Sequence, residues 1–341
     1  MENGGSALME LLNNTYYHRG EPSNWSGRVD GEQPENHRWH QKIVCLDLND
    51  NEVEAPANTR VIAILGFCCD EGVRRNKGRM GSKSGPQAIR NALGSVPVHD
   101  TALVLWDAGD IHCLDGNLES AQNELGEAVR ILLEKGALPL LIGGGHEITF
   151  GHYLGVRQFI QNHSREKGRL GIINFDAHFD NRIPGEDGAS SGTGFYQIHE
   201  EEKKLGADFR YLALGIQRLG NTQALFKQAD QTDTQYILAS EFTDNNYEEI
   251  KGKVMGFLDD IDHLYVTIDL DVFASAYAPG VSAPAALGLI PDGNFIGLLS
   301  MILQSDKLCS LDFAELNPSL DQDHRTAKLA AALIALLSKP L

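Results

Sequence analysis

The sequence predicts an α/β protein built on a mostly parallel sheet of about eight strands. Short apolar runs alternate along the chain with segments of helical periodicity, and several runs are apolar nearly throughout. Such alternation is typical of parallel sheets, whose strands are covered on both faces by crossover helices. The strand candidates are residues 61–65, 102–106, 138–142, 171–175, 211–214, 236–238, 264–270 and 308–313.

The first part of the chain differs from the rest. Residues 1–55 are polar, rich in Asn, Gly and aromatic residues, and show little periodicity. We therefore expect residues 1–55 to form an N-terminal extension that packs on a body made of residues 56–341.

Two helices of the body are clearly marked. One begins near Ser84 and has Pro86 in its first turn, where proline is tolerated. The other lies between the second and third strands, with Asn117 as its N-cap and Gly136 just beyond its end. Its apolar positions recur at helical spacing: Leu118, Ala121, Leu125, Ala128, Val129, Leu132 and Leu133. The apolar run 329–337 is interpreted as a buried terminal helix.

Composition excludes several classes of function. The chain has 29 basic and 47 acidic residues, and its net charge of −18 disfavours nucleic acid and anionic membranes as partners. No apolar run reaches the roughly 20 residues of a membrane span, and the N-terminus does not resemble a signal peptide. The five cysteines form no C-x-x-C pair, which favours a reducing compartment. We therefore expect a cytoplasmic protein.

Acidic residues and histidines gather at the ends of three predicted strands. Gly-Gly-Gly-His-Glu follows strand 138–142, Asp-Ala-His-Phe-Asp follows strand 171–175, and Asp-Leu-Asp closes strand 264–270. These motifs supply six candidate metal ligands: His146, Asp176, His178, Asp180, Asp269 and Asp271. Alternate residues of an extended chain point to the same side, and parallel sheets bind ligands beyond the carboxyl ends of their strands. We expect the six side chains to meet there.

The charge of these groups indicates two divalent metal ions. Four aspartates brought together would repel one another strongly, and two divalent ions would supply about +4. Carboxylate and imidazole ligands suit Mn²⁺ and tolerate Zn²⁺, Co²⁺ or Fe²⁺. In the alternative interpretation, Asp176 and Asp180 cap helices, and His146 and His178 are hydrogen-bonded core residues.

A metal pair favours hydrolysis, because it lowers the pKa of bound water. Glu315 follows the eighth predicted strand and should lie on the same rim of the sheet. A carboxylate there suits a planar cation such as a guanidinium or amidinium group, and suits phosphate badly. The alternative for Glu315 is a helix N-terminal or salt-bridge carboxylate.

Five motifs resemble the ureohydrolase family, which includes arginases, agmatinases and formimidoylglutamases. They are Gly-Gly-Gly-His-Glu, Asp-Ala-His-Phe-Asp, Thr-Ile-Asp-Leu-Asp-Val-Phe, Pro-Gly-Val-Ser-Ala-Pro and Ala-Glu-Leu-Asn-Pro. The resemblance covers about residues 60 to 340, and it implies a single arginase-like domain, a three-layer α/β/α fold with two Mn²⁺ ions. It implies one ion on His146, Asp176, Asp180 and Asp269, and a second on Asp176, His178, Asp269 and Asp271.

The family's arginases and agmatinases carry a His-Gly pair after the second motif. Here Ser191 stands at the histidine position, in a Ser-Ser-Gly-Thr stretch that resembles formimidoylglutamases. This resemblance implies hydrolysis of N-formimidoyl-L-glutamate to L-glutamate and formamide, a step of histidine degradation. A guanidino-acid hydrolase that releases urea remains the nearest alternative, and a non-catalytic metal-binding homologue is a further one.

The implied substrate carries two carboxylates, which need fixed cations. Arg182 lies two residues after Asp180, and in arginase-like enzymes this position contacts the amino-acid end of the substrate. Arg75 and Asn76 follow the first strand and could complete the contact together with Ser191. The alternative for each arginine is a solvated surface charge. We expect a small molecule as the partner, and the sequence leaves a homo-oligomer open.

Overall fold

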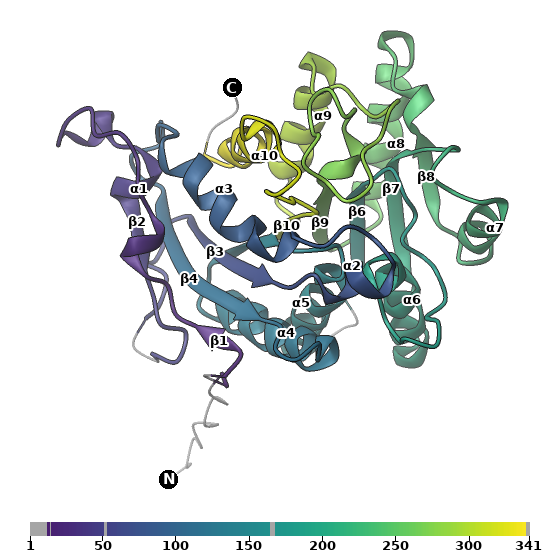
Figure 1. Ribbon diagram of the computed structural model, residues 1–341, viewed down its shortest axis with the longest axis horizontal. Coiled ribbons are helices and arrows are strands. Elements are labelled where there is room, and N and C mark those ends of the chain that lie inside the picture. Colours follow the sequence, from purple (N-terminus) through teal and green to yellow (C-terminus); the bar gives the residue numbers. More distant parts are fainter. Residues whose placement is uncertain (1–11, 14, 51–52, 164–167, 339–341) are drawn as a thin grey trace.

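The structure is a computed structural model that describes residues 12–13, 15–50, 53–163 and 168–338. Its centre is one sheet in the order β1-β4-β3-β5-β10-β9-β6-β7-β8, with β2 also paired to β4 (Figure 1). All of the paired strands run parallel except β1, which is antiparallel to β4. The strands are β1 (Tyr17–His18), β2 (Ile43–Cys45), β3 (Val61–Cys68), β4 (Val104–His112), β5 (Leu138–Gly143), β6 (Leu170–Phe175), β7 (Arg210–Ile216), β8 (Gln235–Leu238), β9 (His263–Asp269) and β10 (Leu308–Ala314).

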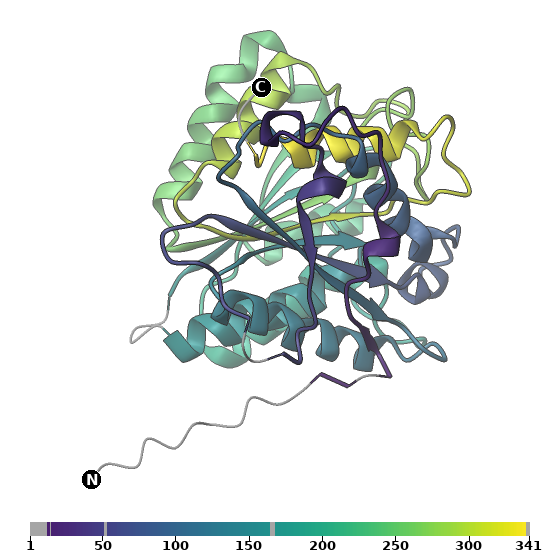
Figure 2. The same ribbon diagram turned by 90° about the vertical axis from the view of Figure 1, so that its left-hand side faces the viewer.

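Helices cover both faces of this sheet and complete three layers (Figures 1 and 2). One face packs against α1 (Trp39–Lys42), α3 (Gly85–Gly94), α8 (Tyr247–Asp259), α9 (Gly293–Leu303) and α10 (Arg325–Ala335). The other face packs against α4 (Leu118–Glu134), α5 (Ile148–His163), α6 (Gly194–Leu205) and α7 (Gln223–Gln231), while the short α2 (Glu71–Arg75) follows β3. The predicted fold class is confirmed. In the described part of the chain no helix is long and apolar enough to cross a membrane.

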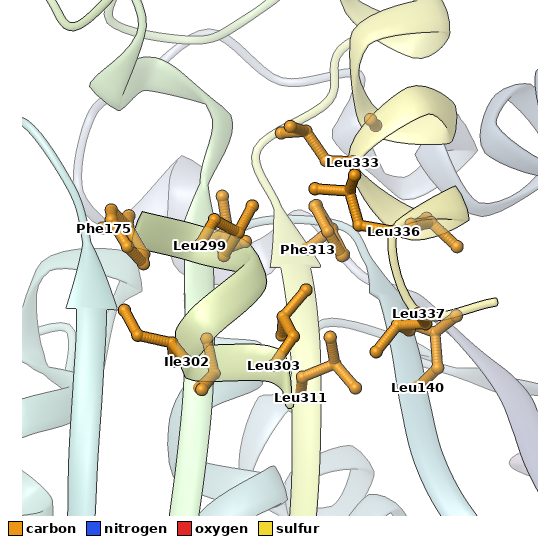
Figure 3. Packing of buried hydrophobic residues seen from close by; sticks show 14 of the residues in the cluster. Leu140, Phe175, Leu299, Ile302, Leu303, Leu311, Phe313, Leu333, Leu336 and Leu337 are labelled. Carbon is orange, nitrogen blue, oxygen red and sulfur yellow. The ribbon is translucent and has the colours of Figure 1, made fainter. Parts of the chain in front are cut away.

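The buried strands explain why both faces need cover. Figure 3 shows α9 and α10 packing onto β5, β6 and β10 through side chains that are almost fully buried. Those labelled are Leu140, Phe175, Leu299, Ile302, Leu303, Leu311, Phe313, Leu333, Leu336 and Leu337. Truncating one such leucine to alanine typically costs about 2–5 kcal/mol of stability. The run 329–337 is confirmed as a buried terminal helix, since α10 and the residues after it bury three of these leucines.

The two well-marked helices begin where the sequence predicts. Ser84 is the N-cap residue of α3, and Pro86 lies within its first two positions. The side chain of Asn117 accepts a hydrogen bond from the N–H of Ser120 and so caps α4. Gly136 follows this helix with a positive φ of 78°. These local signals were sufficient because capping depends only on neighbouring residues.

All eight predicted strands overlap observed ones, but β4 differs most in its limits. It runs from Val104 to His112, whereas the prediction placed it at 102–106. Its second half contains Asp107, Gly109 and Asp110, which are unusual inside a buried strand. A β-bulge interrupts the pairing with β3 here, and Gly109 adopts a φ of 87°.

The N-terminal segment lies along this edge of the sheet, where β1 and β2 both pair with β4 (Figure 2). Trp39 is completely buried, and the indole N–H of Trp25 donates to the buried carboxylate of Asp107 at 2.6 Å. The division into an extension of residues 1–55 and a body of residues 56–341 stays a prediction, and residues 1–11, 14 and 51–52 lie outside the described residues.

Candidate metal centre

Four neighbouring strands, β5, β10, β9 and β6, end at the same edge of the sheet. Every residue of the candidate centre lies at or just after one of these carboxyl ends. The structure brings the six predicted ligand residues together there. One set of donor atoms within 4.8 Å of one another comes from His146, Asp176, Asp180 and Asp269, and another comes from Asp176, His178 and Asp271. Asp176 belongs to both sets, and Asp269 belongs only to the first.

The imidazole of His146 is the centre of the first set. Its Nδ1 lies 2.8 Å from Asp180 Oδ2, 3.2 Å from Asp176 Oδ2 and 3.4 Å from Asp269 Oδ2. His146 and Asp176 are buried, and Asp180 adopts a left-handed φ of 44°. Such backbone strain in a non-glycine residue costs on the order of 1–3 kcal/mol and often marks functional sites.

The second set is more open to solvent. His178 Nδ1 lies 3.0 Å from Asp271 Oδ2 and 3.6 Å from Asp176 Oδ1, and the His178 side chain is 24% exposed. Backbone N–H groups fix the carboxylates, since Asp176 accepts from the N–H of His178 and Asp269 accepts from the N–H of Asp271. The partly exposed imidazole of His178 therefore lies on the solvent side of the centre.

A buried chain of hydrogen bonds, which sequence reasoning missed, holds the His146 ring from behind. His146 Nε2 lies 2.9 Å from Thr267 Oγ1, and that hydroxyl donates to Asp312 Oδ1 at 2.6 Å. Tyr265 and His152 contact the other oxygen of Asp312. Because a carboxylate only accepts, the threonine hydrogen is used on Asp312, and the threonine oxygen must accept from His146 Nε2–H. This leaves Nδ1, which faces the three carboxylates, as the ring nitrogen available to a metal ion.

The pKa values of the histidines and aspartates at the centre are shifted in the way expected for a site that binds cations. Burial opposes charge on His146, but the surrounding aspartates outweigh it and raise its pKa well above the ordinary value. Attraction to Asp271 raises the pKa of His178 in the same way. Burial together with repulsion from Asp271 and Asp176 raises the pKa of Asp269 well above its usual range. Without a metal, protons occupy this centre.

Glu315 follows β10 directly and closes the same edge. It is 5% exposed, adopts a φ of 69°, and its Oε1 accepts from the N–H of His146 at 3.0 Å. Its Oε2 is buried and has no hydrogen-bond partner among the residues that the structure describes. Burial, followed by repulsion from Glu147, raises the pKa of Glu315 to about 8. An anionic Glu315 thus requires a cationic partner beside the centre.

Glu147 is a second buried carboxyl that sequence reasoning did not single out as functional. It is fully buried, and its Oε1 accepts from the N–H of Gly72 at 2.9 Å and from the thiol of Cys69 at 3.3 Å. Burial raises its pKa to about 7. Glu147 thereby joins α2 to the loop that carries His146.

Three of the four predicted substrate-binding residues gather around Gly192. A Cβ built on Gly192 would lie 3.1 Å from Arg182 Cδ and 3.1 Å from Asn76 Nδ2. Asn76 donates to Ser191 Oγ at 3.1 Å, and the N–H of Arg182 donates to the carbonyl of Gly192 at 2.9 Å. Arg182 is exposed, and within the described residues its guanidinium has no partner.

The guanidinium of Arg75, the fourth of these residues, is already fully hydrogen-bonded within the protein. Its Nε donates to Glu71, its Nη1 to Glu119 and the carbonyl of Ala189, and its Nη2 to Glu119 and the carbonyl of Gly116. These contacts use all five donors of a guanidinium. Arg75 therefore ties α2 to two neighbouring loops.

The donor set fits two divalent ions. Four aspartates and two histidines converge, most of them buried, and the described residues bring no lysine or arginine within ion-pair distance of these aspartates. Buried carboxylates require pairing or a metal. Oxygen and imidazole donors without thiolate are suited to Mn²⁺ and related ions.

Comparison with known proteins identifies the family. The model of the Arginase family matches residues 60–338 of this chain. The chain belongs to the arginase family. This assignment agrees with the three-layer fold and with the position of the acidic centre at the carboxyl ends of the strands.

Curated relatives share much of the sequence. The formimidoylglutamase of Chromobacterium violaceum is 44% identical over 318 residues, which cover 93% of this chain and 97% of the relative. The formimidoylglutamase of Geobacillus thermodenitrificans is 45% identical over 320 residues, covering 93% and 95%.

Solved structures share the fold. A Trypanosoma cruzi formiminoglutamase crystal structure with Mn²⁺ has a TM-score of 0.73 and 27% identity, and the match covers 85% of this chain and 96% of that one. A Bacillus subtilis formimidoylglutamase structure matches with a TM-score of 0.75 at 20% identity, covering 100% and 95%.

Proposed function

We propose that the protein hydrolyses N-formimidoyl-L-glutamate to L-glutamate and formamide with two Mn²⁺ ions, as a step of histidine degradation. The observation that carries this proposal is the buried Glu315, which accepts from the backbone N–H of His146 beside the cluster of six ligand-type side chains and whose second oxygen has no partner among the described residues. The identity of 44–45% with formimidoylglutamases supports the choice of substrate, and the Mn²⁺ in the Trypanosoma cruzi structure supports the choice of metal.

The six side chains would hold the two ions between them. We assign one ion to His146, Asp176, Asp180 and Asp269, and the other to Asp176, His178, Asp269 and Asp271. When bound, the ions supply positive charge to the aspartates and lower the pKa of water for hydrolysis. The chain Thr267–Asp312 fixes the His146 ring so that Nδ1, without its proton, is directed at the three carboxylates.

Glu315 would bind the amidinium head of the substrate. Oε1 is held by the backbone N–H of His146, so Oε2 remains for a substrate N–H. A cationic amidinium satisfies the orphaned oxygen and removes the cost of a buried, unpaired carboxylate. A phosphate or carboxylate group would meet repulsion at the same place. Glu315 therefore selects for a planar cation and orients its carbon toward the ligand cluster.

Arg182, Asn76 and Ser191 would bind the carboxylate end. Asn76 donates to Ser191 Oγ, which leaves the serine hydrogen free to donate to an anion. The unpaired guanidinium of Arg182 adds charge and two parallel donors. We assign Arg75 a different role, ordering the rim that presents these residues, because all of its donors are in use.

A substrate panel tests this function. Metal-stripped protein is reconstituted with Mn²⁺ and offered formimidoylglutamate, guanidinobutyrate, arginine and agmatine, while formamide and urea are both quantified. We expect formamide from formimidoylglutamate at a kcat/KM at least a hundredfold above that for any guanidino compound. Urea as the main product would instead identify a guanidino hydrolase, and no turnover of any compound would identify a non-catalytic metal-binding protein.

A further inference from the structure

A second cluster of metal-binding side chains lies away from the acidic centre, at the carboxyl ends of β3 and β4. Donor atoms of Cys68, Asp110 and His112 all lie within 4.8 Å of one another, and all three residues are half-buried. None of them belongs to the sets around His146. The family resemblance and the proposed reaction use none of these three residues.

Strand register explains why these side chains share one face. Cys68 pairs directly with His112, and Gly66 pairs with Asp110. Side chains directly opposite each other in a sheet point to the same side. The bulge in β4 shifts the pairing after Asp107, so that Gly66 lies opposite Asp110. A Cβ on Gly66 would lie only 1.8 Å from Asp110 Oδ1. The absent side chain at Gly66 therefore makes room for the Asp110 carboxylate.

A fourth donor comes from the N-terminal segment. His18 lies in β1 and pairs with Asp110, so it shares the same face. The rings of His18 and His112 are 4.4 Å apart between centroids. Within the described residues neither imidazole has a hydrogen-bond partner, although His112 lies in the same strand as Asp110 and His18 is paired with Asp110. Three donors of types S, O and N thus lie within 4.8 Å of one another, and the exposed imidazole of His18 lies next to them as a candidate fourth.

The local charge is compatible with a divalent ion. Arg90 is buried and donates to Asp110 Oδ1 at 2.7 Å and to both oxygens of Asp107 at 2.9 and 3.0 Å. One arginine against two aspartates leaves a charge of −1, and a Cys68 thiolate would make it −2. Arg90 occupies one oxygen of Asp110, so the other oxygen remains as a donor.

We propose that Cys68, Asp110, His112 and His18 form a binding site for a thiophilic divalent cation of the zinc class. Thiolate and imidazole select Zn²⁺ over Mn²⁺, so this site and the acidic centre would take different metals. Donors around a tetrahedral zinc with bonds of about 2.0–2.3 Å lie about 3.3–3.8 Å apart, so the donor atoms of Cys68, Asp110 and His112, which lie within 4.8 Å of one another, would have to move only slightly closer. Such an ion would fasten β1 to β3 and β4.

Cobalt is the probe, because only a thiolate ligand gives a strong near-ultraviolet charge-transfer band with Co²⁺. Metal-stripped full-length protein is titrated with Co²⁺, and we expect the band to saturate at one thiolate-bound ion per chain. The Cys68→Ser variant should lose the band. The matched control is Cys45→Ser, a half-buried cysteine in the same sheet, which should keep it.

A second variant tests the site even if Cys68→Ser does not fold. His112→Ala keeps the thiol, and we expect it to weaken Co²⁺ affinity at least tenfold while the acidic centre still takes up Mn²⁺. His18→Ala should weaken Co²⁺ affinity, and with the acidic centre already loaded with Mn²⁺ it should reduce the further rise in melting temperature that Zn²⁺ gives to the wild type. Absence of the band in wild-type protein, or its persistence in Cys68→Ser, overturns the proposal and leaves Cys68 as a hydrogen-bonded thiol only.

Discussion

Thr267→Val tests the hydrogen-bond chain behind His146 with little change in shape. The substitution removes the hydroxyl that accepts from His146 Nε2–H and donates to Asp312. Thr267 is completely buried, so no solvent replaces these two hydrogen bonds. Loss of a partner that orients a metal-bound histidine typically weakens metal affinity about ten- to a hundredfold, or about 1.4–2.8 kcal/mol. We expect a loss of this size for the ion assigned to His146, with the ion on His178 and Asp271 retained.

The assay is Mn²⁺ titration by calorimetry, with Thr149→Val as the matched control. Thr149 is equally buried, but its hydroxyl donates to the backbone carbonyl of His146 at 2.9 Å and does not contact the ring. Both variants should lose some stability, because Thr149→Val loses one buried hydrogen bond and Thr267→Val loses two, each worth about 1 kcal/mol. Only Thr267→Val should lose Mn²⁺ affinity. Equal affinities in the two variants would refute the role given to the Thr267 hydroxyl.

Three further predictions follow from the site. Glu315→Gln should keep both ions but lower kcat/KM at least tenfold, since a charge-assisted bond of about 1.5–3 kcal/mol is lost; wild-type turnover would remove Glu315 from the substrate site. Arg182→Ala should lower kcat/KM about tenfold to a hundredfold without changing metal content, and Arg182→Lys should recover only part of it; full activity in either variant would leave Arg182 as a surface charge. The metal-free protein should become less stable as pH rises from about 6.5 to about 8. The pKa values of His146, His178 and Glu315 are raised in the folded protein, so unfolding in this pH range releases protons. Denaturant unfolding in the presence of chelator measures this, and a stability that increases over the interval would contradict it.

The strand pattern and the meeting of the motifs could be predicted because both depend on simple periodicity. Short apolar runs such as 171–175 that alternate with helices are interpreted as buried strands of a parallel sheet. The carboxyl ends of parallel strands share an edge, so Asp176 and Asp269 could be placed at the same edge, and the pairing of β6 with β9 then brings them close together. Their role as ligands stays a prediction. The second half of β4 was missed, because Asp107 and Asp110 are stabilised in the strand by Arg90 and Trp25, which no local signal pairs with them.

Partners set by register and by loop conformation could not be predicted. Thr267 contacts Asp312 because β9 and β10 pair with these residues opposite each other, and no local signal gives that pairing. Arg75 is a cation of the type that binds carboxylates, but apart from Glu71 in its own helix its partners lie more than 40 residues later in the chain, at Gly116, Glu119 and Ala189. The placement of Asn76 against Ser191 depends on the same long-range contacts.

A metal titration of turnover shows whether hydrolysis depends on two metal ions. Metal-stripped protein is supplied with increasing Mn²⁺, and formamide released from formimidoylglutamate is measured at each step. The structure predicts no turnover without metal, a maximum at two equivalents per chain, and little activity at any Mn²⁺ concentration in Asp269→Asn. Full turnover in the metal-free protein, or a maximum that Asp269→Asn also reaches at two equivalents, would contradict a dinuclear centre built from these six side chains.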